Sequence, residues 1–410
     1  MERIKLAKQM TDRSVIKLHE HKSLNSVELS QVQAEQIRTH FSKYISVERS
    51  WGVGWTLRAK QYVGTIVLDG LRIVIEPKTA VSNLFYMLTY AYDLPQFRKE
   101  ITTHDLADDM FEFIAAIFAG QIEQLVRRGI YRSYVEQEEN HRFLRGKLMM
   151  GEQIRRNSVR VTHFYQQNCE FTADILENHI LKYTLWLLSH LDYRTPHLRQ
   201  RLRRLTSAFV ETALRPVRAL ECNKVVYTRL NAAYCNPIHL AHLLLQHLSL
   251  EGKQGKMPFA AFLFDMNNVF ELFVARFLEQ HFAEIGSAFS VEIQPQIWLG
   301  QELKERGIPD IVLRHHGRRF MVLDTKYKAF KGHPAGDDRN QMYMYCRSLD
   351  LNHGCLIYPD KANYQNTFPD VTLRADGLSL GGSLAVFRER CTKFAAKFTE
   401  LVAKEVETAV

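Results

Sequence analysis

The chain has 410 residues, of which 46% are hydrophobic and 24% are charged, so it is long enough for two or three globular domains. Its formal charge of +9 indicates either an ordinary basic enzyme or a protein that binds a polyanion such as nucleic acid. The six cysteines form no CxxC pair, no apolar run reaches the roughly 18 residues that span a bilayer, and no apolar signal segment follows Met1. These features argue against a zinc ribbon, a disulfide framework and a membrane protein, and they predict a cytoplasmic location.

Residues 1–165 are predicted to form an α+β domain that carries β-hairpins. Apolar spacing predicts a helix over Ser26–Tyr44 with Ser26 as its N-cap, and further helices over Asn83–Ala91 and Leu106–Arg128. Asp69-Gly70 is typical of a two-residue hairpin turn. Period-two alternation predicts strands at residues 12–20, Trp55–Lys60, Tyr62–Leu68, Leu71–Glu76, Tyr131–Glu136 and Val159–Tyr165.

Residues 166–256 are predicted to be a helical connecting region. The helices are expected at Asp174–Leu191, Pro196–Leu214 and Asn231–Leu250. The second helix carries four arginines between Arg199 and Arg204, which indicate either a solvated face or a DNA-facing patch. The segment from Glu251 to Lys256 contains two glycines and no apolar residue, so it is the expected linker.

Residues 257–410 are predicted to form an α/β domain with a mixed sheet flanked by helices. Two apolar strands surround His315-His316-Gly317-Arg318, and a helical crossover follows them, which is the order that gives a mixed sheet. The other expected elements are helix Phe262–Phe282, strand Phe289–Trp298, helix Asp337–Leu349, strand Gly354–Tyr358 and helix Phe387–Val402.

Two acidic residues and a lysine are expected to meet at one end of this hairpin. Antiparallel pairing around the turn places Asp310 opposite position 323 or 324. Asp324 and Lys326 are two residues apart and share a face, whereas Thr325 is expected to point away from the acids. A salt bridge between Lys326 and Asp310 is the structural alternative, but it does not explain the second acid.

This constellation predicts a divalent-cation site for phosphodiester hydrolysis. Asp310 and Asp324 are the predicted ligands of Mg²⁺, or of Mn²⁺, and the main-chain carbonyl of Thr325 is a further candidate ligand. Lys326 is predicted to orient or activate the attacking water and to stabilise the charge that develops on the phosphate. Glu271 on the preceding helix is a candidate outer ligand, with a solvated helix residue as the alternative. Gln341 and Tyr345 lie one helical turn apart and are candidates to line the same cleft, with packing or surface exposure as the alternative. Lys328 and Arg339 are candidate phosphate contacts.

Pro309-Asp310 on one strand and Asp324-Thr325-Lys326 on the next resemble the PD-(D/E)XK nuclease superfamily. Blocks elsewhere in the chain extend the likeness. Together they resemble the McrC family of nuclease subunits from McrBC-type restriction systems, from about Gly52 to Tyr358. The blocks are Tyr62-Val63-Gly64, Leu71–Lys78, Asn83–Leu88, Arg145–Leu148, Glu177–Lys182 and Asn268–Glu271.

The resemblance implies a two-subunit machine that cuts double-stranded DNA carrying modified cytosine. It implies that an oligomeric AAA+ GTPase of the McrB type binds GTP, and that this chain joins it through the N-terminal domain and stimulates its GTPase. Arg58, Lys60 and Arg72 are candidate contacts for that partner. The chain has no G-x-x-x-x-G-K-[ST] motif of its own, in agreement with this division. Two other functions stay open: a non-cleaving adaptor of an NTPase, and a stand-alone DNA repair nuclease.

Overall fold

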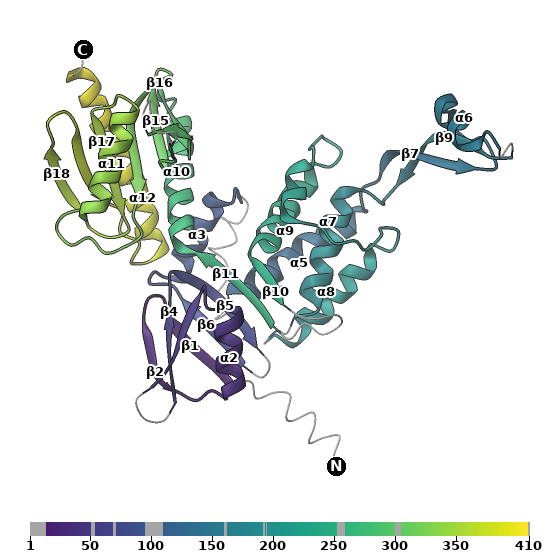
Figure 1. Cartoon of the computed structure of the whole chain (residues 1–410), viewed down its shortest axis with the longest axis horizontal. Coiled ribbons are helices and arrows are strands. Elements are labelled where there is room, and N and C mark those ends of the chain that lie inside the picture. Colours follow the sequence, from purple (N-terminus) through teal and green to yellow (C-terminus); the bar gives the residue numbers. More distant parts are fainter. Residues whose placement is uncertain are drawn as a thin grey trace. The chain divides into compact units, whose positions relative to one another are not determined.

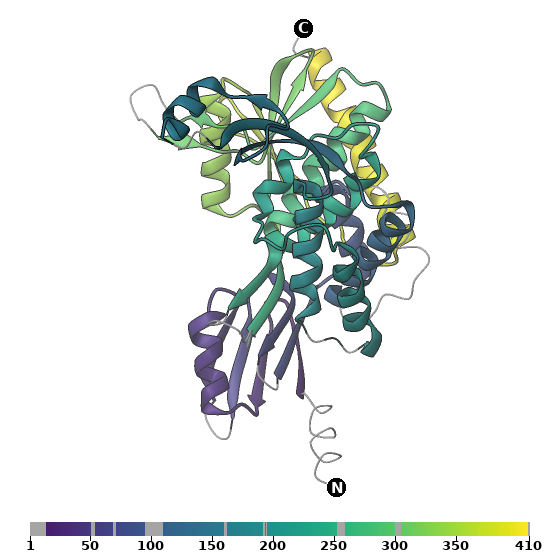
Figure 2. The ribbon, with the colours of Figure 1, turned by 90° about the vertical axis from the view of Figure 1, so that its right-hand side faces the viewer.

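The chain folds as a mixed α/β protein with several sheets (Figures 1 and 2). This computed structural model describes residues 14–50, 54–68, 71–94, 110–159, 162–191, 193, 195–251, 259–299 and 305–408. One compact unit combines Met1–Met110 with Ala261–Val410, and the other is Phe111–Ala260. The predicted division at residues 165 and 256 assigns the N-terminal and C-terminal segments to separate domains, whereas the first unit contains both.

The first sheet explains why the two ends of the chain share a unit. Its order there is β1-β6-β5-β11, with β1 (Ser14–His19) parallel to β6 (Leu71–Glu76) and β5 (Tyr62–Leu68) antiparallel to β6. Strand β11 (Phe259–Asp265) lies beside β5. A Cβ atom on Gly64 would lie 2.0 Å from the carbonyl oxygen of Phe262, so only glycine permits this approach. The strands predicted here are confirmed, and Asp69-Gly70 lies outside the described residues.

A small antiparallel sheet in the same unit has the order β2-β4-β3 and is accompanied by one helix. The strands are β2 (Ser23–Val27), β4 (Trp55–Ala59) and β3 (Ile45–Arg49). The predicted helix start at Ser26 is wrong, because Ser26 lies in β2 with a φ of +57°. Helix α2 (Gln31–His40) begins after Ser30, whose hydroxyl accepts from the Gln33 amide at 3.1 Å while the Gln33 side chain accepts from the Ser30 amide. This reciprocal capping box sets the start of the helix after Ser30 rather than after Ser26.

The unit of residues 111–260 is mainly helical and carries one antiparallel ribbon. Its helices are α5 (Met110–Arg128), α6 (Met150–Asn157), α7 (Leu176–Ser189), α8 (Pro196–Ala208), α9 (Cys235–His247) and two short 3₁₀ turns at Ala219–Lys224 and Ala232–Tyr234. The strands are β7 (Ser133–His141), β8 (Lys147–Leu148), β9 (Phe164–Thr172) and β10 (Leu248–Glu251). In the predicted arginine patch on α8, both Arg201 and Arg204 form ion pairs with Glu123. Most of the predicted linker lies outside the described residues.

The second sheet of the first unit is mixed and has the order β12-β15-β16-β17-β19-β18. Pairing is antiparallel at β12–β15, β15–β16 and β18–β19, and parallel at β16–β17 and β17–β19. The strands are β12 (Phe289–Ile293), β15 (Ile311–His315), β16 (Arg318–Thr325), β17 (His353–Tyr358), β18 (Asn363–Thr367) and β19 (Thr372–Gly377). The predicted strand Phe289–Trp298 is divided, since Ile297–Trp298 forms β13 and pairs with β14 (Arg306–Gly307).

Helices pack against this sheet, and one of them also contacts a helix from the N-terminal part of the chain (Figure 1). Helix α11 (Gly336–Ser348) covers one face, where Met342 and Tyr345 share a core cluster with Val322 and Leu356. Helix α10 (Met266–Glu284) packs on β12 and β16 and also on α3 (Val81–Ala91), with Tyr90 and Phe273 ring centroids 5.7 Å apart. The predicted helix start at Phe262 is wrong, because the preceding residues form β11 and Asp265 caps α10 through the Asn267 amide.

The C-terminal helix α12 (Leu384–Thr408) completes the unit. It packs on α3, and the Asn83 amide donates to the carbonyls of Leu380 and Gly382 at 2.9 Å each. Within the described part of the chain, no helix has the length and apolar character to cross a membrane.

Candidate active site

The two acids predicted as metal ligands lie at the same end of the β15–β16 hairpin. The register pairs Ile311 with Leu323, which places Asp310 opposite Asp324 one residue further on. The predicted register is therefore confirmed. Only 3% of Asp324 is exposed, because the strand is central in the sheet and covered by helices.

Thr325 holds one carboxylate oxygen of Asp310. Its amide donates to Asp310 Oδ2 at 2.7 Å, and its hydroxyl donates to the same atom at 2.8 Å. The prediction that the Thr325 side chain points away from the acids is wrong, because β16 ends at this residue and strict alternation ends with it. The two hydrogen bonds fix Asp310 and leave its other oxygen, Oδ1, for a ligand.

Lys326 connects the acids to helix α11. Its ammonium nitrogen lies 2.5 Å from Asp324 Oδ2 and donates to Gln341 Oε1 at 2.9 Å. The Gln341 amide nitrogen in turn donates to the Tyr345 hydroxyl at 3.1 Å. Gln341 and Tyr345 therefore lie at the site, and the ion pair of Lys326 is with Asp324 rather than with Asp310.

Glu271 approaches the same end of the sheet from α10. Its carboxylate accepts a hydrogen bond from the Gln294 side chain at 2.6 Å. Burial is the main cause that raises the pKa of Glu271, and the charge of Asp324 adds to it while Gln294 and Lys326 oppose it. The negative charge of Glu271 in turn adds to the effect of burial in raising the pKa of Asp310. Glu271 thus adds negative charge to the site, and Gln294 holds its carboxylate through this hydrogen bond.

Burial and mutual repulsion raise the pKa of both aspartates to about 6. For Asp310 the main cause is burial, followed by the charge of Glu271, while Thr325 and Lys326 oppose the rise. For Asp324 the causes are burial and then the charge of Asp310, opposed by Lys326. Burial lowers the pKa of Lys326, but the surrounding acids, led by Asp324, raise it overall. The site therefore holds excess negative charge that a cation would relieve.

The donor set fits a hard divalent cation. Asp324 Oδ2 is buried and ion-paired with Lys326, but within the described residues no group donates a hydrogen bond of favourable geometry to it. Among the described residues, no three His, Cys, Asp or Glu side chains converge to hold a metal by themselves. Two carboxylates with water or phosphate oxygens completing the shell is the coordination that Mg²⁺ commonly uses.

Two residues at the site were missed by sequence reasoning. Asp338 on α11 is buried, forms an ion pair with Lys328 at 2.6 Å, and raises the pKa of Asp324 and of Lys326. Helical periodicity did not point to Asp338. Its position in the first turn of the helix that follows Lys326 was a signal that could have identified it. Gln294 has a φ of +48° between β12 and β13, a backbone state that no sequence pattern indicates.

The predicted N-terminal partner contacts are only partly accessible. Arg72 is buried within β6, and the Lys60 ammonium donates to the Ser42 carbonyl at 2.8 Å. Arg58 on β4 is exposed.

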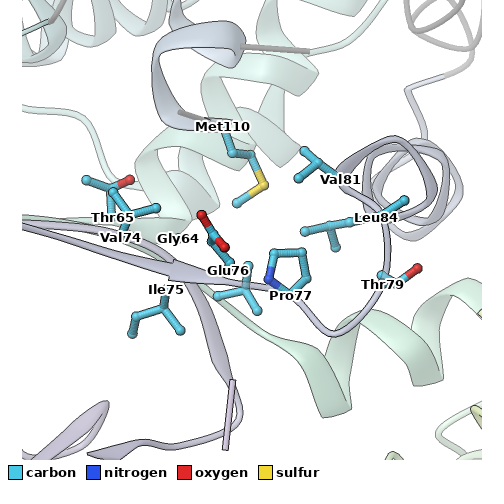
Figure 3. Close-up of a pocket in the computed structure, with 12 residues that line it drawn as sticks. Gly64, Thr65, Val74, Ile75, Glu76, Pro77, Thr79, Val81, Leu84 and Met110 are labelled. Carbon is cyan, nitrogen blue, oxygen red and sulfur yellow. The ribbon is translucent and has the colours of Figure 1, made fainter. Parts of the chain in front are cut away.

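A separate pocket of about 310 Å³ lies where β5 and β6 meet the start of α3 (Figure 3). Most of its wall is apolar, including Val74, Leu84 and Met110. Glu76 is its one acidic lining residue, and that carboxylate is ion-paired with Lys17 and His19. None of the acids or the lysine at the hairpin end lines this pocket.

Comparison with known proteins places the chain in a family. A chain in the assembly of Thermococcus gammatolerans McrB AAA+ hexamers with bound McrC has the same fold, with a TM-score of 0.60 and 22% identity over 93% of this chain and 99% of that one. A chain of the Thermococcus gammatolerans McrBC complex matches with 25% identity over 65% of this chain and 87% of that one, at a TM-score of 0.44. No protein of curated function matches in sequence. The model of the McrBC 5-methylcytosine restriction system component matches residues 57–359, from β4 to the end of β17, and the chain belongs to that family.

Proposed function

We propose that this chain is the endonuclease subunit of a restriction complex that cuts double-stranded DNA with modified cytosine in a Mg²⁺-dependent reaction. The observation that carries the proposal is the convergence of Asp310, Asp324 and Lys326 at one end of the hairpin, with both acids buried. The order α10, β12, β15, β16, α11, β17 supports assignment of residues 257–410 to the PD-(D/E)XK superfamily.

Each residue has a defined task in this proposal. Asp310, oriented by Thr325, and Asp324 hold the cation, and the Thr325 carbonyl is a third candidate ligand. When bound, the cation neutralises phosphate charge and lowers the pKa of a coordinated water. Lys326, held between Asp324 and Gln341, orients the attacking water and stabilises charge on the phosphate. Gln341 positions Lys326 from α11, and Glu271 on α10, held by Gln294, is the candidate outer ligand.

The partner in this proposal is an AAA+ GTPase that forms an oligomeric ring. The similar solved assembly is described as McrB AAA+ hexamers with bound McrC, and this chain lacks a P-loop for a nucleotide of its own. GTP is therefore bound by the partner, and this chain stimulates its hydrolysis and supplies the cleavage site.

Cleavage of methylated DNA by the reconstituted pair tests the assignment. We expect Asp324→Ala and Lys326→Ala to reduce cutting at least roughly 100-fold, because the first removes a proposed ligand of the cation and the second removes the group proposed to orient the attacking water. Arg318→Ala is the matched control, since Arg318 lies at the opposite end of the same hairpin. GTP hydrolysis should stay within two-fold of wild type in all three, which shows that the complex still assembles.

The outcomes separate the competing functions. Undiminished cutting by both variants would falsify the nuclease assignment. GTPase stimulation without cutting by the wild type under any metal would identify a non-cleaving adaptor. Cutting by the chain alone, independent of GTP, would identify a stand-alone nuclease.

A further inference from the structure

The segment between Gln294 and Asp310 leaves the candidate active site and returns to it. At the outgoing end, the Gln294 side chain donates to Glu271 and its amide donates to the Asp310 carbonyl at 2.8 Å. At the returning end, the Tyr345 hydroxyl donates to the Ile308 carbonyl at 3.4 Å. Between these anchors, β13 and β14 pair through Ile297 with Gly307 and Trp298 with Arg306. We call these two paired strands the β13–β14 ribbon.

The base of the ribbon packs against α11. A Cβ atom on Gly307 would lie 2.9 Å from the Tyr345 ring, so the backbone packs directly on that side chain. Ile297 is buried in the same core cluster as Tyr345. Tyr345 accepts from Gln341, which accepts from Lys326. The ribbon is thus joined to the lysine of the site through two side chains.

The outer side of the ribbon presents an aromatic ring and a cation to solvent. Trp298 is 56% exposed, and the Arg306 guanidinium lies 4.9 Å from the centre of its ring. Arg306 also donates to the Gln296 side chain at 3.2 Å, which holds the guanidinium over the indole. Ile308, the residue before Pro309-Asp310, is 50% exposed.

The chemistry of these three side chains suits a nucleic-acid ligand. An exposed indole stacks on nucleobases, whose faces are all π-systems, and a planar guanidinium pairs with phosphate oxygens. A small exposed aliphatic side chain beside them matches the apolar wedges with which proteins partly unstack a base step. The formal charge of +9 agrees with a polyanionic ligand.

We propose that Trp298, Arg306 and Ile308 form a DNA-contact surface that grips the duplex beside the bond to be cut. Arg306 pairs with a backbone phosphate, while Trp298 and Ile308 contact base or sugar faces at the adjacent step. This inference rests on the proposed nuclease function, and it adds residues that position DNA without touching the reacting atoms. Hydrogen bonds through Gln341 and Tyr345 connect Lys326 to the Ile308 carbonyl at the end of the ribbon. The proposed DNA-contact surface is therefore held next to the candidate active site.

Binding measured without cutting tests the surface. The full chain, with its AAA+ partner and a non-hydrolysable GTP analogue, is titrated into a fluorescein-labelled duplex containing 5-methylcytosine, in Ca²⁺ to suppress cleavage. We expect Trp298→Ala to weaken binding roughly ten-fold, whereas Trp298→Phe keeps a stacking ring and weakens it less. Arg306→Ala should reduce the slope of log affinity against log salt by about 1, as expected for one lost phosphate contact.

Tryptophan emission adds a readout that a merely structural role would not move. Stacking on bases should quench the wild-type emission on DNA binding, and Trp298→Phe should lose that quench. Arg318→Ala and Ile285→Ala, at exposed positions away from the ribbon, are the matched controls and should bind as wild type. Unchanged unfolding midpoints in all variants show that the fold is intact.

The outcomes distinguish this inference from the nuclease assignment. The proposed DNA-contact surface would be overturned if the Trp298 and Arg306 variants kept the wild-type DNA affinity, salt dependence and fluorescence quench. This holds even if Asp324→Ala abolishes cutting. Normal cutting by both Asp324→Ala and Lys326→Ala, with weakened binding by Trp298→Ala, would overturn the assigned nuclease centre and retain the DNA-contact surface. Failure of the wild-type complex to bind the duplex would overturn the surface as well.

Discussion

At the scale of residues, the site is a concentration of negative charge that the fold itself disfavours. Asp310 and Asp324 face each other across a hairpin, and burial together with their neighbours raises the pKa of each to about 6. One lysine, Lys326, offsets only part of that charge. The two aspartates interact, so they titrate as a pair with apparent pKa values that belong to both.

The pair predicts a stability that falls as pH rises. Between pH 4 and 6 the folded aspartates hold protons that the unfolded chain has released, so the free energy of unfolding decreases through this interval and stays low above it. Asp324→Asn removes one charge, and above pH 6 without metal it should be more stable than wild type by on the order of 2 kcal/mol. Thermal unfolding in EDTA at pH 5 and pH 8 measures this.

Mg²⁺ should reverse the difference in stability between the wild type and Asp324→Asn. Millimolar Mg²⁺ at pH 8 should raise the midpoint of the wild type and leave that of Asp324→Asn nearly unchanged, because binding to the native state stabilises it. A wild-type protein that is equally stable at both pH values and indifferent to Mg²⁺ would contradict this account.

At the scale of elements, the end of β1 is tied to the end of β16. Glu20, fully buried after β1, accepts a hydrogen bond from Tyr327 at 3.1 Å and lies 3.7 Å from the Lys78 ammonium. Tyr327 directly follows Lys326, and its ring contacts Phe270 on α10. The N-terminal strands therefore help to fix the strand that carries the lysine.

Removing one hydroxyl tests this connection. Tyr327→Phe removes the hydrogen bond that Tyr327 donates to the buried Glu20, and we expect a loss of about 1–2 kcal/mol in the free energy of unfolding. Tyr343→Phe is the matched control, since that hydroxyl donates at 3.0 Å to Asp370 in a less buried setting, and its loss should be smaller. Urea unfolding of both variants decides, and equal losses would contradict a special role for Tyr327.

Local sequence signals predicted the hairpin and its register, because alternation and turn chemistry act within a few residues. They placed Asp310 opposite position 323 or 324, and the structure selects Asp324. They predicted the wrong direction for the Thr325 side chain, since the direction of a side chain at a strand end depends on its neighbours in space. The helix start at Phe262 was wrong because a run of phenylalanines suits a buried strand as well as a helix. Distant partnerships such as Glu20 with Tyr327 have no local signal at all.

At the scale of the molecule, the first unit is discontinuous in sequence. Residues 261–410 share a sheet, a helix pair and several hydrogen bonds with residues 1–110. The predicted nuclease domain of residues 257–410 thus lacks part of its own core when taken alone, including the α3 rings that pack on Phe273.

A fragment experiment measures this dependence. Residues 257–410 expressed alone should show no cooperative thermal unfolding, because the apolar faces of β11 and α10 lose β5 and α3 and lie in water. The full chain should unfold cooperatively under the same conditions. A well-folded fragment with its own sharp transition would restore the three-segment division at residues 165 and 256.

The approach of Gly64 to Phe262 also sets the order of events during synthesis. These residues are about two hundred positions apart, so the pairing of β5 with β11 is a contact of high sequence separation that forms late. Residues 111–260, which form their own compact unit, are synthesised before β11 can pair with β5. Asp310, Asp324 and Lys326 follow residues 111–260 in the chain, so a nascent chain that stops before Asp310 carries the helical unit but none of these three residues of the candidate site.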